Sequence, residues 1–370
     1  MTDTPTRSVA FVLASWTPNA PAGMERATAA VALGLAERGH HAIIITATAE
    51  APNQYDGVEI VGLAGLPLSL PCNDDTLRAA TQRHRDAIAR ELTNVYLSRQ
   101  VDTAVYVDAL WGLGAIMPTD ATTRRVLAAH VVGHDTDLRA ALDRRPHAVI
   151  APSPVVLDRA TARGYDTASW SVVPNGLLSD PKPGLPARRR QLRDGGPIRV
   201  LARLGPEKGV EELLRAAPAD LDRRTQVALA AAGFDNADQS QLWDRCRSHA
   251  DQHPGMTVRF GMGWREVPGW LADAAVVIVP SLRETFGLVA LEAMSVGTPV
   301  VAYAVDHLPA LIETGGVLVP VQEDPAGLWR AATTLLADPV TYEATSRAAY
   351  YRTRDYRPAL VADQLLKVVS

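Results

Sequence analysis

Short apolar runs alternate along this chain with longer stretches whose apolar residues recur at helical spacing. The first run, residues 8–14, predicts a buried strand, and residues 22–38 predict a helix that ends at Gly39. Residues 41–48 are strand-like again. Strand, helix and strand in this order predict a βαβ unit with two parallel strands.

The same alternation continues through the rest of the chain. Further apolar runs predict strands at 58–62, 103–107, 125–129, 148–151, 198–201, 226–231, 258–260, 275–279 and 300–302. Helical stretches such as 75–97 and 339–370 lie between or after them. This order predicts an α/β fold in which helices cover parallel sheets.

A proline-rich stretch with the basic run Arg188-Arg189-Arg190 interrupts the alternation and predicts an irregular linker at 179–196. We therefore expect one Rossmann-like domain at 1–178 and a second at 197–345. A length of 370 residues suits two such domains, with a cleft between them. The final segment, 346–370, is expected to cross back and pack on the first domain.

Composition excludes several classes of protein. With 47% hydrophobic and 21% charged residues, the chain has no apolar run long enough to span a bilayer, and its N-terminus lacks the pattern of a signal peptide. We expect a cytoplasmic protein without stable membrane insertion. A net charge of −4 gives no reason to expect a nucleic-acid partner. The two cysteines, Cys72 and Cys246, lack the spacing of a structural zinc site and fall in different predicted domains.

The segment from Pro280 to Pro299 carries the strongest chemical pattern. It follows a very apolar strand, and we expect Glu284 on the loop after that strand and a helix from Leu288 to Gly297. Amides near Phe286, Gly287 and Leu288 would then favour a diphosphate at the start of the helix. Glu284 and Glu292 can accept hydrogen bonds from sugar and ribose hydroxyls. The alternative is a capping role for Glu284 and a solvated side chain for Glu292.

A second pattern lies at the end of the strand that begins at residue 198. Arg203 and Lys208 occupy a turn that contains Gly205, Pro206 and Gly209. A planar guanidinium and an ammonium can together neutralise a pyrophosphate as the bond to it breaks. The alternative is an ordinary pair of surface cations on a turn.

Taken in order, these motifs resemble the retaining GT-B glycosyltransferases of family 4, the group 1 glycosyl transferases, over nearly the whole chain. The series consists of Gly23 with Glu25, Arg38-Gly39-His40, Pro174-Asn175-Gly176, Arg203 with Lys208-Gly209, and Glu284 with Glu292. The resemblance implies two Rossmann-like α/β domains that face each other across a cleft. It also implies an enzyme that moves a sugar from a nucleoside diphosphate to an acceptor held by the first domain.

The resemblance assigns roles to single residues. Arg203 and Lys208 would bind the diphosphate, Glu284 would reach the transferred sugar, and Glu292 would bind the ribose. Gly23 would let the first domain approach the donor phosphates. A histidine of the first domain faces the sugar in this family; His130 after the strand at 125–129 fits that place, and His134 is a second candidate.

The base of the nucleotide would lie at Gly261-Met262-Gly263. This loop does not discriminate uracil from guanine, although we expect UDP ahead of GDP. Asp135-Thr136-Asp137 has the spacing of a DxD metal motif, but it directly precedes a helical stretch, where Asp or Thr is an expected N-cap. We therefore predict no metal site and no cofactor.

The chain departs from the family where glycines are common. Ala22 precedes Gly23, Ala202 precedes Arg203, and Asp306-His307 replaces a Gly-Gly pair. Asp306 and His307 are candidates for binding a small polar acceptor that bears an amine. The alternative is that Asp306 caps the helix that follows.

Retention of configuration would follow from attack on the face that the diphosphate leaves, with the leaving group as base.

Three alternatives stay open. The chain could be a GT-B epimerase or phosphorylase, or an inactive sugar-nucleotide-binding partner of another transferase. It could also act at a membrane surface through the arginines of 75–97, although acidic residues interrupt that stretch.

Overall fold

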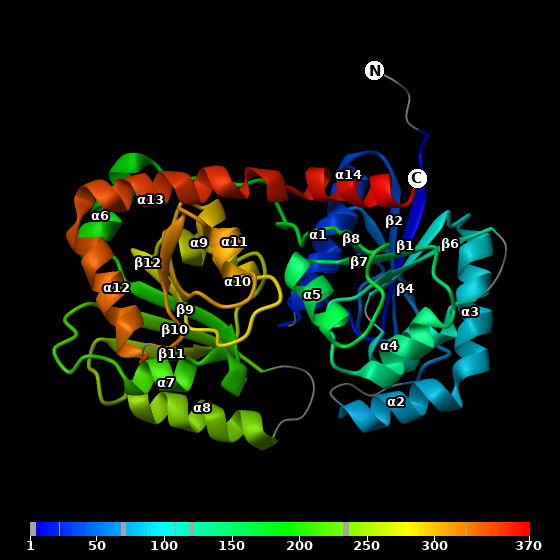
Figure 1. The fold of residues 1–370 in the computed structure, drawn as a ribbon, viewed down its shortest axis with the longest axis horizontal. Coiled ribbons are helices and arrows are strands. Elements are labelled where there is room, and N and C mark those ends of the chain that lie inside the picture. The colour runs from blue at the N-terminus through cyan, green and yellow to red at the C-terminus, as the bar shows by residue number, and fades with distance from the viewer. Residues whose placement is uncertain are drawn as a thin grey trace. The chain divides into compact units, whose positions relative to one another are not determined.

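The structure is a computed structural model that describes residues 5–21, 23–67, 72–107, 109–118, 122–231, 237–322 and 324–370. The chain divides into two compact units. Unit 1 comprises Met1–Ser179 with Tyr356–Ser370, and unit 2 comprises Asp180–Asp355 (Figure 1). Each unit is a sheet of parallel strands with helices packed against it, so the predicted α/β class is confirmed.

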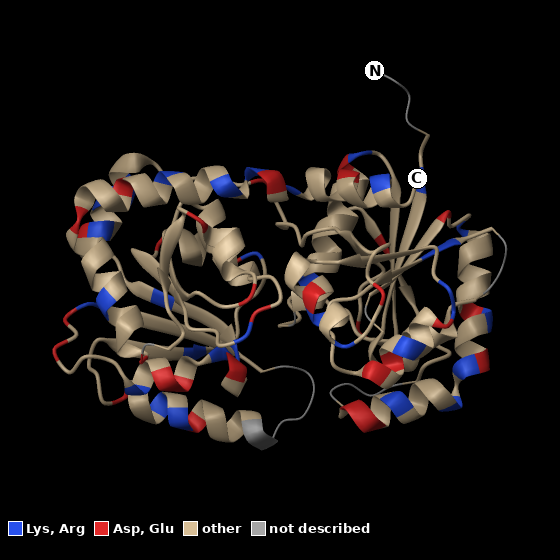
Figure 2. Ribbon diagram, viewed as in Figure 1, with Lys and Arg blue, Asp and Glu red and all other residues tan. Residues whose placement is uncertain are grey.

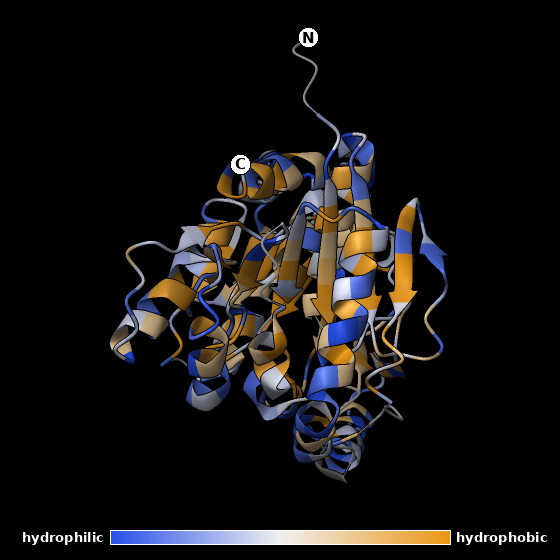
Figure 3. Ribbon diagram, turned by 90° about the vertical axis from the view of Figure 1, so that its right-hand side faces the viewer, coloured by the Kyte–Doolittle hydropathy of each residue, from blue (hydrophilic) through white to orange (hydrophobic). Residues whose placement is uncertain are grey.

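Unit 1 holds an eight-stranded sheet in the order β3-β4-β2-β1-β5-β6-β7-β8. All neighbouring strands are parallel except β3 and β4. The strands are β1 (Ser8–Leu13), β2 (His41–Thr46), β3 (Gln54–Tyr55), β4 (Val58–Gly62), β5 (Thr103–Val107), β6 (Arg124–Ala128), β7 (Ala148–Ala151) and β8 (Ser171–Val172). Every residue of β1 is buried, because strands on both sides and helices on the faces cover it. The strands of this unit are mostly hydrophobic (Figure 3).

The helical segments of unit 1 are α1 (Gly23–Glu37), α2 (Asp74–Arg83), α3 (Arg85–Ser98), η1 (Leu110–Ile116), α4 (Asp135–Leu142), α5 (Pro154–Ala162) and α14 (Pro358–Val368). The single helix predicted at 75–97 is wrong, because the chain breaks at His84 into α2 and α3. Helix α14 packs directly on α1. A Cβ atom on Gly34 would lie 2.0 Å from the carbonyl oxygen of Pro358, so only glycine permits this contact.

Unit 2 holds a six-stranded parallel sheet in the order β11-β10-β9-β12-β13-β14. Its strands are β9 (Ile198–Arg203), β10 (Thr225–Ala230), β11 (Met256–Phe260), β12 (Val276–Val279), β13 (Val300–Tyr303) and β14 (Gly316–Val319). The chain runs from β9 outward through β10 and β11, and then returns to β12 on the other side of β9. Strands β9 and β12 therefore flank the point where the strand order reverses, and ligands of open α/β sheets bind at the carboxyl ends of such a pair.

The helical segments of unit 2 are α6 (Pro186–Gly195), η2 (Pro206–Lys208), α7 (Val210–Arg215), α8 (Ala237–Ala250), α9 (Val267–Ala272), α10 (Leu288–Ser295), α11 (Leu308–Ile312), α12 (Ala326–Ala337) and α13 (Pro339–Arg352). A further turn, η3 (Thr353–Tyr356), contains the boundary between the units. The stretch predicted as helical at 339–370 is therefore broken after Arg352 and resumes at Pro358.

The irregular linker predicted at 179–196 is wrong for its second half, which forms α6. Pro186 is compatible with this helix because it stands in the first turn, where no backbone donor is needed. Arg189 on α6 is 4% exposed and donates hydrogen bonds to the Thr298 hydroxyl and to the carbonyl groups of Ala272 and Ala274. A basic residue of the expected linker thus anchors a helix inside unit 2. Most other charged residues lie on helices and loops (Figure 2).

Candidate active site

The turn after β9 packs against the loop after β12. Gly209, at the end of η2, has a left-handed backbone with φ of 62°, and a Cβ atom there would lie 2.3 Å from the carbonyl oxygen of Pro280. The Leu282 amide also donates to the Glu207 carbonyl group at 2.9 Å. The two sequence patterns that carry the predicted chemistry are therefore joined at the carboxyl ends of adjacent strands.

An ion pair links the two patterns. The Lys208 Nζ atom lies 2.8 Å from the Glu284 Oε2 atom, and the two side chains are only 15% and 17% exposed. Arg203, the last residue of β9, lies beside this turn, with its guanidinium 3.7 Å from the Glu207 carboxylate. Arg203 and Glu207 are each 39% exposed, so their attraction is screened more strongly by water. Both predicted cations thus have carboxylate neighbours within the protein.

Helix α10 begins at Leu288, as the sequence predicts, and Gly287 is its N-cap. Gly287 has φ of 106°, and a Cβ atom there would lie 2.6 Å from the Leu308 Cδ2 atom. Glu292 on this helix is 7% exposed, so the alternative of a solvated side chain is wrong. Glu292 thus lies about one turn inside α10, on a buried face of the helix.

Asp306 and His307 contact the loop that carries Glu284. The Asp306 Oδ2 atom accepts a hydrogen bond from the Glu284 amide at 2.6 Å, and the His307 ring stacks on Phe286 with centroids 5.4 Å apart. The N-cap of α11 is His307 rather than Asp306, so the capping alternative for Asp306 is wrong. Burial, and then the nearby charge of Arg352, lower the pKa of His307.

The predicted base loop follows the edge strand β11. The Gly261 amide donates to the Leu229 carbonyl group at 2.7 Å, and the Gly263 amide donates to the Glu266 carboxylate at 3.1 Å. Met262 between them is half-buried. The amides of Gly261 and Gly263 thus already donate hydrogen bonds within the protein. Fewer backbone donors of this loop therefore remain for a base.

In unit 1, the predicted glycine of the donor site opens α1, the next element of the chain after β1. Gly23 is exposed at the first position of the helix, and the neighbouring Ala22 lies outside the described residues. Two residues further on, Glu25 is 5% exposed and accepts a hydrogen bond from the Ser15 hydroxyl at 3.0 Å. The Trp16 indole also donates to the Glu25 carbonyl group. These bonds fix the start of the helix against the end of the strand.

His130 follows the carboxyl end of β6 and lines a cavity of about 40 Å³. Most of the lining is apolar, and Pro174 and Asn175 of the sequence series contribute to it as well. Burial lowers the pKa of His130 to about 4, so its imidazole is neutral near pH 7. His134 instead stands at the N-cap of α4 without a capping side-chain bond. Which of the two histidines faces the sugar stays a prediction.

The two carboxylates of the DxD pattern are turned toward separate partners. Asp137 accepts from the Arg78 guanidinium at 3.0 Å and from the Trp111 amide at 3.1 Å. Asp135 accepts from Arg163 and from the Tyr165 hydroxyl, each at 3.1 Å. The N-cap of α4 is His134, so the predicted cap at Asp135 or Thr136 is wrong. Among the described residues, no group of three or more His, Cys, Asp or Glu side chains is placed to hold a metal ion.

Residues 198–338, most of unit 2, match the family model described as Glycosyl transferases group 1. Unit 2 is a group 1 glycosyl transferase domain. A solved sucrose-phosphate synthase from Thermosynechococcus elongatus covers 98% of this chain, with 98% of its own chain matched, at a TM-score of 0.77 and 22% identity. The HepE protein of Anabaena covers 98% of this chain, with 99% of its own chain matched, at a TM-score of 0.76 and 18% identity. Both units together therefore have the GT-B fold.

Curated relatives align over part of their length. A D-inositol 3-phosphate glycosyltransferase of Frankia alni is 30% identical over 268 residues, which cover 67% of this chain and 65% of the relative. A relative of the same name from Catenulispora acidiphila is 33% identical over 177 residues, which cover 44% of this chain and 40% of the relative. This chain thus spans less than two thirds of the length of these relatives.

Several contacts of the group 1 domain were not predicted from the sequence. They are the Glu207 neighbour of Arg203, the bond from Asp306 to Glu284, and the stacking of His307 on Phe286. The Arg203–Glu207 contact lies within a single turn. The contacts of Asp306 and His307 instead join segments that are distant in sequence, so no local pattern signals them. The sequence does place Asp306 and His307 after a strand end, which was the available clue.

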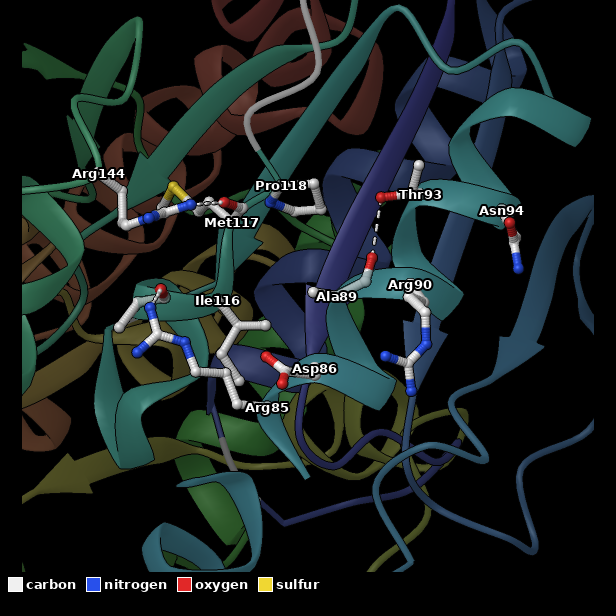
Figure 4. A pocket seen from close by; sticks show the side chains of 11 residues that line it. Arg85, Asp86, Ala89, Arg90, Thr93, Asn94, Ile116, Met117, Pro118 and Arg144 are labelled. Carbon is white, nitrogen blue, oxygen red and sulfur yellow. Dashed lines mark hydrogen bonds between the residues drawn. The ribbon is translucent and has the colours of Figure 1, made fainter. Parts of the chain in front are cut away.

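Unit 1 also has a groove that contains none of the predicted site residues. It has a volume of about 480 Å³ and lies between α3 and residues 115–118, with Arg85, Arg90 and Arg144 among its lining residues (Figure 4). Arg85 and Arg144 donate to carbonyl groups of the facing segment, Ala115 and Met117, so they stabilise its conformation.

No helix of the described part of the chain is both long and apolar enough to cross a membrane.

Proposed function

We propose that this chain is a retaining glycosyltransferase that moves a sugar from a nucleoside diphosphate, UDP ahead of GDP, to a small polar acceptor. The observation that carries the proposal is the Lys208–Glu284 pair at the carboxyl ends of β9 and β12. The pair lies where an open α/β sheet reverses its strand order, which is the usual ligand position of such sheets. It lies within the group 1 domain.

Arg203 and Lys208 would neutralise the diphosphate as the glycosidic bond breaks. Negative charge on the leaving group grows in the transition state, and fixed cations stabilise that charge more than they stabilise the ground state. Lys208 would then share its ammonium between the diphosphate and Glu284. The Glu284 carboxylate, held beside that ammonium, would accept hydrogen bonds from hydroxyls of the transferred sugar.

The remaining predicted residues would bind the rest of the donor. Glu292, buried on α10, would accept from the ribose hydroxyls, while Gly261, Met262 and Gly263 would border the base. Amides near Phe286, Gly287 and Leu288 would face the diphosphate at the start of α10. In unit 1, Gly23 would permit close approach of the phosphates, and His130, neutral near pH 7, would exchange a hydrogen bond with the sugar.

The comparisons support the donor and acceptor classes. The Anabaena protein was solved with UDP-glucose, and the Frankia relative is named for transfer to D-inositol 3-phosphate, a small polar molecule. An amine on the acceptor stays a prediction that rests on the charge of Asp306. Two cations at the diphosphate site make a divalent ion unnecessary, so we propose a metal-independent reaction.

Calorimetric titration tests the division of roles. We expect the chain to bind UDP more tightly than GDP and to bind UDP-glucose with a contribution from the sugar. Glu292→Ala should weaken UDP binding about tenfold, because a buried ribose hydroxyl loses its acceptor. Glu284→Ala should weaken UDP-glucose binding and leave UDP binding nearly unchanged. Equal losses for both ligands in both variants would contradict this assignment.

Turnover, rather than binding, separates the alternatives. An inactive partner of another transferase would bind UDP-glucose without ever releasing UDP in the presence of acceptors. An epimerase would convert the donor sugar and need no acceptor. A transferase releases UDP at a rate that rises with acceptor concentration, which a coupled assay for UDP would detect.

A further inference from the structure

Residues Asp306, His307 and Leu308, the 306–308 segment, contact the turn Glu284–Gly287 at three places. Asp306 accepts from the Glu284 amide at 2.6 Å. His307 stacks on Phe286, with 29° between the ring planes. The Leu308 side chain occupies the space that a Cβ atom of Gly287 would need. Successive residues of the 306–308 segment thus contact successive parts of the turn, first through a hydrogen bond, then through ring stacking, and then through an aliphatic contact.

The backbone explains which residues can stand at position 306. Asp306 has φ of 50°, in the left-handed region where glycine is most comfortable and where aspartate and asparagine are tolerated better than most residues. Aspartate tolerates the conformation and adds an acceptor oxygen, which glycine lacks.

We propose that Asp306 is a positioning residue for the transfer reaction. Its carboxylate holds the Glu284 main chain and thereby aims the Glu284 side chain toward Lys208, whose Nζ atom lies 2.8 Å from Glu284 Oε2. This inference rests on the proposed function, because it assumes that Glu284 binds the transferred sugar. It differs from recognition of an acceptor amine, since the hydrogen bond needs an acceptor oxygen at position 306 and not a negative charge.

Two substitutions separate the oxygen from the charge. Asp306→Asn removes the charge and keeps both the acceptor oxygen and tolerance of a left-handed backbone. Asp306→Gly keeps the backbone conformation and removes the acceptor. Asp338→Gly is the matched control, because Asp338 accepts from the amides of Val340 and Thr341 at the start of α13, in the same unit, and has no proposed role in the site.

Calorimetry with UDP and UDP-glucose gives a readout that needs no acceptor. The measured quantity is the gain in affinity that the glucose of UDP-glucose adds to UDP. We expect this gain to fall about tenfold in Asp306→Gly, as in Glu284→Ala. The affinity for UDP itself should stay nearly unchanged. In Asp306→Asn and Asp338→Gly that gain should stay close to the parent value. The losses from Asp306→Gly and Glu284→Ala should not add in the double variant. An unchanged gain in Asp306→Gly, or an equal loss in Asp306→Asn, would overturn the proposal.

Amide hydrogen exchange at Glu284 tests the contact without any donor. The Glu284 amide should exchange slowly in the parent chain and in Asp306→Asn, and at least about tenfold faster in Asp306→Gly. Equal exchange rates in all three proteins would overturn the proposal. If slow exchange is seen but the parent chain binds neither UDP nor UDP-glucose, the proposed donor fails while the Asp306 contact stands.

Discussion

Lys208 lies at the centre of the candidate site because one ammonium serves two partners there. It pairs with Glu284 at 2.8 Å, and the diphosphate is proposed as its second partner. Arg203 has a longer contact with Glu207 and more exposure, so less rearrangement is needed before it meets a phosphate. The two cations therefore differ in how strongly the protein itself holds them.

Replacing either cation should impair the chemical step. We expect Lys208→Ala or Arg203→Ala to lower kcat by about two orders of magnitude, because each is proposed to stabilise charge that grows as the diphosphate leaves. The unfolding midpoint should change little for Arg203→Ala, whose side chain is well exposed. Purified variants that turn over at nearly the parent rate would remove the role assigned to these residues.

His130 should make stability depend on pH. Burial lowers its pKa from 6.5 to about 4 in the folded chain, so the unfolded chain binds more protons between these values. This stability is fully present above pH 6.5 and is lost as pH falls toward 4. Relative to His130→Gln, the parent chain should lose up to about 2 kcal/mol between pH 7.5 and pH 5. Urea unfolding of both proteins at each pH measures this difference, and a constant difference would show that His130 titrates normally.

At the scale of elements, the sequence predicted the strands that line the site because they are continuous apolar runs. It missed β3 and β8, because strands of two residues have no periodicity to detect, and it also missed β14. It also missed α6, since proline and arginine together indicate a loop until the buried partners of Arg189 are known. The placement of Glu284 and the start of α10 succeeded because Gly287 marks the turn locally, whereas the contact from Asp306 spans 22 residues and depends on tertiary packing.

The packing of η2 on the loop after β12 should depend on Gly209. Gly209→Ala would force a methyl group against the Pro280 carbonyl oxygen at a left-handed backbone position. We expect it to destabilise unit 2 by about 1–3 kcal/mol and to weaken UDP binding. Gly195→Ala, at the end of α6 with nothing near the added methyl group, is the matched control and should have little effect. Equal thermal unfolding of the two variants would mean that the η2 contact is dispensable.

At the scale of the whole molecule, each unit is a parallel sheet with a reversal of strand order, between β1 and β5 in unit 1 and between β9 and β12 in unit 2. Gly23 and His130 follow strands of the first sheet, and Arg203, Lys208 and Glu284 follow strands of the second. The sequence predicted this division because apolar periodicity repeats in both halves. The acceptor could not be predicted, since its specificity depends on side chains that no local pattern brings together.

Retaining, metal-independent transfer can be measured with UDP-glucose whose anomeric carbon is labelled with ¹³C. The reaction is run in excess EDTA with a pool of small polar acceptors that includes D-inositol 3-phosphate and amino sugars. NMR of the labelled carbon reports both transfer and anomeric configuration. We expect an α-linked product, with the configuration of the donor retained, at a rate that falls about a hundredfold in Lys208→Ala. A β-linked product, a requirement for added metal, or equal transfer by Lys208→Ala would contradict this expectation.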